Sequence, residues 1–144
     1  MKRIVSLLVG TAVWVALIGL TTTAYAQAGC TNATLTGNYG FSFSGFSTKK
    51  GLNGPLYPFY GAGLVTFDGL GSVSGAFTYS FNGDGGVSNI PYSSRYTVNL
   101  DCTVSLIGTN GGDSFEGVIV SGGSEILATD ITAPDTLNVD FKRQ

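Results

Sequence analysis

SVSGAFTYSF, residues 72–81, is the stretch that decides the fold. Val73, Phe77, Tyr79 and Phe81 share one parity, and small residues occupy the other. Successive side chains of a β-strand point to opposite faces, so a period of two residues separates these two sets. The stretch therefore predicts a half-buried strand with an aromatic inner face and a solvent-exposed outer face.

The same alternation recurs along most of the chain. Tyr39, Phe41 and Phe43 alternate with glycine and serine, and Gly45 then predicts a bulge that brings Phe46 into phase with the inner face. No segment after residue 27 shows a clear helical period. The expected strands are 39–46, 57–67, 72–81, 92–100, 102–108, 113–122, 125–130 and 137–142.

Glycine-rich turns separate these strands. Asp68-Gly69 is a hairpin signal, because the aspartate can accept hydrogen bonds from its own turn and the glycine can adopt a positive φ. Asn99 and Asp101 are expected to cap a second turn. We predict an all-β fold, an antiparallel up-and-down barrel of about eight strands, since closure removes exposed strand edges. A two-sheet sandwich is the alternative, because the sequence does not show whether the first strand pairs with the last.

Residues 1–26 read as an export signal. Lys2 and Arg3 precede an apolar run, and Ala24-Tyr25-Ala26 is a small-x-small cleavage site. We therefore predict a mature chain that starts at Gln27 and is secreted or periplasmic, with no membrane span. A retained membrane anchor and a lipid-modified Cys30 are the alternatives. An outer-membrane barrel is a third, although acidic residues interrupt the later strands.

Removal of 26 of the 144 residues leaves 118, which form one domain, 27–144, with five basic and nine acidic side chains. This acidic balance argues against nucleic acid and against anionic lipid surfaces as partners. Cys30 and Cys102 are the only cysteines, so one structural disulfide is expected between them, consistent with an oxidising compartment.

Three blocks of the chain, 30–40, 66–75 and 96–103, carry a resemblance. They read Cys-Thr-Asn-Ala-Thr-Leu-Thr-Gly-Asn-Tyr-Gly, Thr-Phe-Asp-Gly-Leu-Gly-Ser-Val-Ser-Gly and Tyr-Thr-Val-Asn-Leu-Asp-Cys-Thr. In order and spacing they resemble a group of exported, uncharacterised bacterial β-proteins. The resemblance implies a lipocalin-like or allene-oxide-cyclase-like barrel and the Cys30 to Cys102 bond, and it implies no activity. Val104 departs from the glycine usual at that position.

Catalytic signatures are sparse. The chain has no histidine, which excludes Ser-His-Asp triads and histidine metal ligands. Acidic pairs such as Asp113 with Glu116, or Glu116 with Glu125, are expected to be solvated charges. Two loops offer oxygen ligands without a known calcium spacing. Their polar residues are Asn82, Asp84, Asn110 and Asp113. We therefore predict no catalytic residues, no metal and no cofactor.

The aromatic run 57–60 is the most promising binding feature. It follows a loop that contains Lys50, and adjacent aromatic residues on a strand point to opposite faces. Lys50, Tyr57, Phe59 and Tyr60 are the predicted ligand-binding residues at one end of the barrel, for a small apolar or sugar-like ligand. The alternative is a hydrophobic plug that closes the barrel. The sequence thus favours a non-catalytic small-ligand-binding or structural barrel; a surface-interaction protein or a lipocalin-like isomerase are the alternatives.

Overall fold

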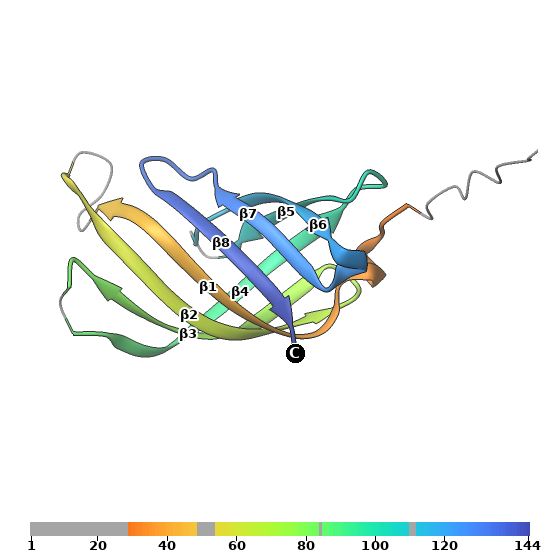
Figure 1. Cartoon of the computed structure of the whole chain (residues 1–144), viewed down its shortest axis with the longest axis horizontal. Helices are drawn as coiled ribbons and strands as arrows, with labels where there is room; N and C mark the ends of the chain where they lie inside the picture. The colour runs from red at the N-terminus through yellow and green to blue at the C-terminus, as the bar shows by residue number, and fades with distance from the viewer. Residues whose placement is uncertain (1–28, 49–53, 84, 110–111) are drawn as a thin grey trace, which may run out of the picture.

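The computed structural model describes residues 29–48, 54–83, 85–109 and 112–144. Eight antiparallel strands follow one another around a single closed barrel (Figure 1), so the predicted up-and-down barrel is confirmed. The predicted signal segment, 1–26, lies outside the described residues. The strands are β1 Thr36–Thr48, β2 Leu56–Asp68, β3 Ser72–Phe81, β4 Val87–Val98, β5 Thr103–Gly108, β6 Phe115–Val120, β7 Glu125–Asp130 and β8 Thr136–Arg143.

Pairing of the first strand with the last closes the barrel. On β1, Phe41 lies opposite Gly63 of β2 on one side and Phe141 of β8 on the other. The β1–β8 ladder runs from Tyr39 opposite Arg143 to Phe46 opposite Thr136. In a two-sheet sandwich β1 and β8 would each lie at an open sheet edge, so the alternative prediction of a sandwich is wrong.

Side chains alternate between the interior and the outer face as the sequence predicts. The structure corrects the sequence prediction at Gly45 and at the end of the strand expected over 92–100. The predicted bulge at Gly45 was wrong, because β1 and β2 stay in one-to-one register through it and Phe46 points outward, 49% exposed. Gly45 is required because a Cβ there would collide with the Thr136 carbonyl oxygen. The strand expected over 92–100 ends at Val98, which leaves Leu100 in an exposed turn.

One end of the barrel, which we call the sealed end, is closed by the chain before β1. A short 3₁₀ helix, η1 (Asn32–Thr34), precedes the fully buried Leu35. The Tyr96 hydroxyl lies 3.0 Å from the Leu35 carbonyl oxygen and 3.1 Å from that of Asn32. Asn32 Oδ1 accepts a 2.8 Å hydrogen bond from the Val98 amide. These contacts attach the helix to β4 across the barrel base.

The disulfide lies at the same end. Cys30 and Cys102 are bonded, with Cα atoms 4.9 Å apart, so the predicted disulfide is confirmed. It ties the segment before η1 to the turn between β4 and β5. The predicted cap of that turn is confirmed too, because Asp101 Oδ1 accepts hydrogen bonds from the Thr103 amide and hydroxyl.

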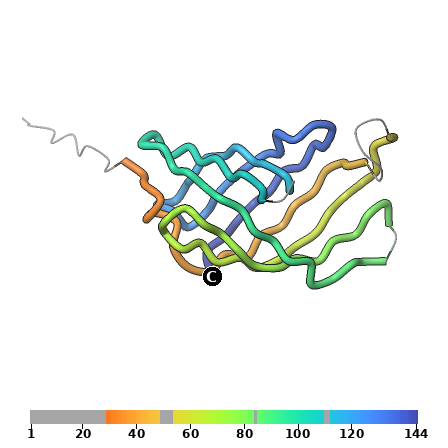
Figure 2. Tube along the Cα trace, turned by 180° about the vertical axis from the view of Figure 1, so that it is seen from behind, coloured from red at the N-terminus to blue at the C-terminus, as the bar shows by residue number. Residues whose placement is uncertain are grey.

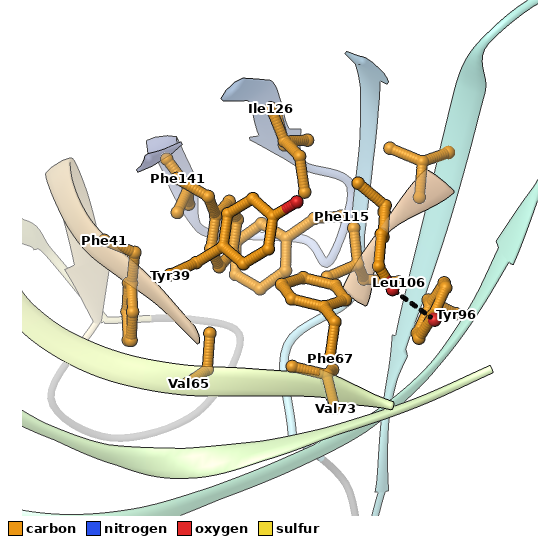
Figure 3. Close-up of a cluster of buried hydrophobic side chains, with 14 of the residues drawn as sticks. Tyr39, Phe41, Val65, Phe67, Val73, Tyr96, Leu106, Phe115, Ile126 and Phe141 are labelled. Atoms are coloured by element: carbon orange, nitrogen blue, oxygen red, sulfur yellow. Dashed lines mark hydrogen bonds between the residues drawn. The ribbon is translucent and has the colours of Figure 1, made fainter. Parts of the chain in front are cut away.

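Aromatic rings fill the interior above this base (Figure 3). The Phe67 ring is 5.0 Å from that of Tyr39, 5.1 Å from that of Tyr96 and 5.9 Å from that of Phe141, each measured between centroids. All three contacts are edge-on, a favourable arrangement for aromatic rings. The half of the barrel next to the sealed end is therefore a packed core.

A polar cluster completes the sealed end. The Tyr39 hydroxyl donates to the Gly123 carbonyl oxygen and accepts hydrogen bonds from Arg143 Nε (3.0 Å) and Nη2 (2.8 Å). Arg143 Nη2 also donates to the Thr34 carbonyl oxygen at 2.9 Å. The last residue of β8 is thereby bound to β1, to the β6–β7 connection and to η1.

The turn between β2 and β3 also lies at the sealed end and follows the predicted chemistry. Asp68 Oδ1 accepts hydrogen bonds from the amides of Leu70, Gly71 and Ser72 at 2.7 to 2.9 Å. Gly69 has a φ of 77°, which favours glycine. The backbone hydrogen bonds, led by that from Ser72, lower the pKa of Asp68. The Asp68-Gly69 hairpin is confirmed.

The opposite end, which we call the open end, holds the loops after β1, β3, β5 and β7. β5 and β6 have six residues each, whereas β1 and β2 have 13. In the described residues, β4 pairs with β5 only from Ser94, opposite Gly108, although β4 begins at Val87. Seen from behind in Figure 2, β5 and β6 end well short of the β3–β4 hairpin. The barrel wall is thus uneven at this end.

Candidate functional site

A pocket of about 380 Å³ occupies the barrel interior toward the open end. This volume lies within the range of small-molecule sites, about 300 to 1,000 Å³. Most of its lining side chains are apolar and many are aromatic. The lining residues are Phe41, Phe43, Phe59, Phe77, Ile90, Pro91, Tyr92, Ser93, Thr109, Gly112, Asp113, Phe115, Leu137, Val139 and Phe141.

Two glycines of β2 make room for the aromatic side of the pocket. Gly61 lies opposite Phe43, and Gly63 lies opposite Phe41. A Cβ at Gly61 would stand 2.5 Å from Phe43 Cζ, and one at Gly63 would stand 2.6 Å from Phe41 Cε1. Both rings therefore lie over glycine backbone, where any larger residue would displace them.

The rings form a continuous aromatic surface. Phe41 lies 6.3 Å from Phe77 and 6.1 Å from Tyr92, and Phe43 lies 5.1 Å from Phe59 and 5.8 Å from Phe77, between centroids. Four different strands, β1 to β4, supply these side chains. A planar or apolar ligand can contact several ring faces at once.

Two polar groups stand out on the pocket wall. The Tyr92 hydroxyl is buried and has no hydrogen-bond partner among the described residues. Burial raises the pKa of Tyr92, the Ser94 side chain opposes part of that shift, and the charge of Asp113 adds to it. Asp113 lies just before β6 and also lines the pocket, and its charge acts on Tyr92. A buried hydroxyl without a partner is costly, and a bound polar group would satisfy it.

Asp113 belongs to a cluster of three aspartates at the open end. One carboxylate oxygen each of Asp113, Asp130 and Asp135 lies within 4.8 Å of the others. Burial raises the pKa of Asp113 to about 6, and the charges of Asp130 and Asp135 add to the shift. Burial is also the main cause of the raised pKa of Asp130. The cluster gives this side of the pocket a negative potential.

Hydrogen bonds from backbone amides hold two of the three carboxylates in place. Asp130 Oδ1 accepts a 2.6 Å hydrogen bond from the Thr132 amide, and Asp135 Oδ1 accepts a 3.3 Å one from the Thr48 amide. Asp130 is only 9% exposed, and its Oδ2 has no partner among the described residues. Three carboxylates are ligands of the type that calcium prefers, so this cluster is where a hard metal ion could be held.

The structure separates the four residues that the sequence put forward for ligand binding. Phe59 lines the pocket. Tyr57 is half-buried at the rim, with its ring 5.7 Å from that of Phe81. Tyr60 lies on the outer face and is 48% exposed. Lys50 lies outside the described residues.

The pocket depends largely on residues that sequence reasoning did not propose for binding. The sequence pattern places Phe41, Phe43 and Phe77 on the inner faces of expected strands, and Tyr92 is the first residue of the expected strand 92–100. Their alternation was a usable signal, because it already placed them inside. No local signal joins Asp113 to Asp130 and Asp135, since their proximity depends on how β6, β7 and β8 lie side by side.

The other acidic and calcium candidates do not form a site in the described residues. Glu116 points to the outer face, where Oε1 accepts a 2.8 Å hydrogen bond from the Ser105 hydroxyl. Glu125 is 3.4 Å from Lys142 Nζ in an ion pair that Asp140 shares at 3.2 Å. Of the loop residues that could offer oxygen ligands to calcium, Asp84 and Asn110 lie outside the described residues.

A second depression, of about 540 Å³, lies on the outer wall over β1, β6, β7 and β8. Exposed Val118 and Leu127 and the side chains of Ser44 and Asn138 line it. It is shallow and faces away from the aromatic interior. The interior pocket is therefore the better candidate for a functional site.

Comparisons with known proteins do not identify the function of this site. Among the described residues, no helix has both the length and the hydropathy needed to cross a bilayer. The resemblance to exported bacterial β-proteins remains a prediction beyond the barrel architecture itself. No family model, no curated protein and no solved structure matches this chain.

Proposed function

We propose that the protein is an exported binding protein that holds one small, largely apolar molecule in the interior pocket. The observation that carries the proposal is the aromatic pocket of about 380 Å³ in a barrel whose other end is sealed. Interior barrel space of this size that is lined by rings is typical of carriers of small ligands.

The main alternative for the aromatic residues is a plug that only closes the barrel. The packed rings around Phe67 already perform that role at the sealed end. Toward the open end, by contrast, the rings of Phe41, Phe43 and Phe59 border a space of about 380 Å³ that no described side chain fills. Empty apolar volume of this size is costly in a purely structural core, which favours a binding role.

Export is part of the same proposal. The Cys30–Cys102 disulfide fits a compartment where disulfides persist, and the apolar segment before Gln27 has the features of an export signal. We propose a secreted or periplasmic location on these two grounds.

A second candidate function is a proton-transfer isomerase. Asp113, whose pKa is about 6, and Tyr92, whose hydroxyl has no hydrogen-bond partner among the described residues, both line the apolar pocket. A carboxylate titrating near neutral pH suits a general base, and a tyrosine hydroxyl can donate to a developing oxyanion. Binding remains the preferred function, because it needs only the pocket.

The test is ligand binding to the mature protein, 27–144, with a panel of fatty acids, small aromatic compounds and oligosaccharides. Thermal shift detects binders, and titration calorimetry measures their Kd. Phe59→Ala removes a wall of the pocket, so Kd should rise about tenfold for an aromatic ligand, a loss of about 1.4 kcal/mol. Tyr60→Ala is the matched control, because the neighbouring ring lies on the outer face.

Two outcomes would overturn this proposal. One is the absence of binding by every member of the panel. The other is an equal effect of the two alanine variants, which would put the ligand outside the barrel. Turnover of an enone or epoxide ligand that depends on Asp113 would instead support the isomerase.

A further inference from the structure

Building on the proposed binding function, we infer that the ligand is an organic cation: an aromatic or apolar body with a protonated amine that pairs with Asp113. The inference rests on the placement of charged side chains around the barrel and on the ring faces near the Asp113 carboxyl. It names the chemical class of the ligand and the residue that selects it.

The first argument is charge. Among the described residues that line the pocket, Asp113 is the charged one, and Asp130 and Asp135 belong to the same cluster of carboxylates. Three like charges so close together in a half-buried setting are unfavourable unless a cation or a proton neutralises them. A ligand that brings a positive charge relieves this repulsion, whereas an anionic head group increases it.

The described basic residues lie elsewhere. Arg95 is exposed on the outer face, where Nη1 donates to the Ser72 hydroxyl at 3.2 Å. Lys142 is on the outer face in its pairs with Glu125 and Asp140, and Arg143 is bound to Tyr39 at the sealed end. None of these three cations neutralises the aspartate cluster.

The second argument is the aromatic lining. Phe41, Phe43, Phe77 and Tyr92 surround the same space that Asp113 borders. The negative face of an aromatic ring attracts a cation, and the attraction strengthens where water is excluded. The pocket thus offers an ammonium group both a carboxylate and ring faces, while its apolar body contacts the remaining rings.

The third argument is the unpartnered hydroxyl. Among the described residues, the Tyr92 oxygen is buried without a hydrogen-bond partner of good geometry, and Tyr92 and Asp113 both line the pocket. A protonated amine has up to three donors and no acceptor, so it can donate to both the carboxylate and the phenol oxygen. A carboxylate ligand would have to accept from Tyr92 next to the repelling charge of Asp113.

The experiment is a charge series on one carbon skeleton, measured by titration calorimetry with the mature protein at pH 7.5 in the presence of EDTA. The probes are 3-phenylpropylamine, which is cationic, 3-phenylpropan-1-ol, which is neutral, and 3-phenylpropanoate, which is anionic. EDTA keeps divalent metal ions away from the three aspartates. At this pH the Asp113 carboxyl, with a pKa of about 6, is ionised.

We expect the amine to bind at least about tenfold more tightly than the alcohol, and the carboxylate to bind most weakly. Asp113→Asn should bring the affinity for the amine down to that for the alcohol and leave the alcohol unchanged. Glu116→Gln is the matched control, because it removes an acid three residues away on the outer face. Circular dichroism confirms that both variants are folded.

The outcomes separate this inference from the function it rests on. If the alcohol or the carboxylate binds as tightly as the amine, or if Asp113→Asn leaves the preference for the amine intact, the cation inference is overturned and the binding function stands. A preference for the carboxylate would likewise overturn the cation inference, because it would show that a basic side chain selects the ligand. If none of the probes and no member of the larger panel binds, the binding function itself fails.

Discussion

The ring of Phe43 lies directly over Gly61, its partner across the β1–β2 ladder, so closely that a single methyl group at Gly61 would stand 2.5 Å from Phe43 Cζ. Gly63 and Phe41, the next inward-facing pair of the same ladder, have the same relationship. These two pairs set the orientation of the rings that line the pocket. The same contacts therefore affect both the stability of the barrel and the shape of the interior pocket.

Gly61→Ala should therefore destabilise the protein by about 1 to 3 kcal/mol, because the added methyl group overpacks the interior. Urea unfolding of the variant and the wild type measures the change in the free energy of unfolding. Gly85→Ala is the control, since a Cβ there meets nothing within 4 Å. Equal stability of Gly61→Ala and the wild type would contradict the prediction, because a Cβ at Gly61 also meets the Thr78 carbonyl oxygen.

Reduction of the disulfide should cost a large part of the stability. Cys30 and Cys102 are separated by 72 positions, and the chain-entropy estimate for a loop of that length is about 4 kcal/mol. The double variant Cys30→Ser, Cys102→Ser should unfold at a much lower urea concentration than the oxidised wild type. Dithiothreitol should shift the wild type by a similar amount and have no effect on the double variant. An unchanged midpoint on reduction would contradict the prediction.

The sealed end offers a test that is independent of the pocket. Tyr39→Phe removes the hydroxyl that accepts from Arg143 and donates to the Gly123 carbonyl, which leaves buried polar groups unpaired. We expect a loss of about 1 to 3 kcal/mol in the free energy of unfolding. Tyr60→Phe, at an exposed tyrosine, should change stability by less than about 0.5 kcal/mol. A variant as stable as the wild type would mean that water replaces the lost contacts.

Asp113 predicts a pH dependence of stability with a definite sign. Its pKa is about 6 in the folded protein and about 3.8 for the ordinary group, so between these values the folded state binds a proton that the unfolded state has released. This contribution to stability is present below about pH 4 and is lost as pH rises through 6. Asp113→Asn should lessen the decline in stability and raise the melting temperature at pH 7 to 8, and the raised pKa of Asp130 accounts for the part of the decline that the variant keeps.

A series of melting temperatures from pH 4 to pH 8 compares the variant with the wild type. Asp68 and Asp101 act in the opposite sense, because hydrogen bonds lower their pKa values and their contribution is lost only as pH falls below about 4. They therefore do not mask the effect in this range. Parallel curves for the wild type and Asp113→Asn would contradict the prediction.

Local chemistry made most of the strands and turns predictable. The alternation in 72–81 placed Val73, Phe77 and Tyr79 on the inner face, and Asp68-Gly69 marked a hairpin that formed as expected. These features depend on neighbours within a few residues, where backbone geometry links sequence to direction. The bulge at Gly45 failed because the reason for that glycine is the approach of Thr136 from β8, which no local pattern contains.

The sequence by itself determined a chain of half-buried strands, their inner faces, the chemistry of their turns and the only possible disulfide. Tertiary structure alone decided that β1 closes on β8, that Phe59 but not Tyr60 enters the pocket, and that Asp113 meets Asp130 and Asp135. The physical reason is the distance along the chain over which each feature is determined. Alternation is a property of one strand, whereas closure, cavity volume and the meeting of charges depend on the register between strands far apart in the chain.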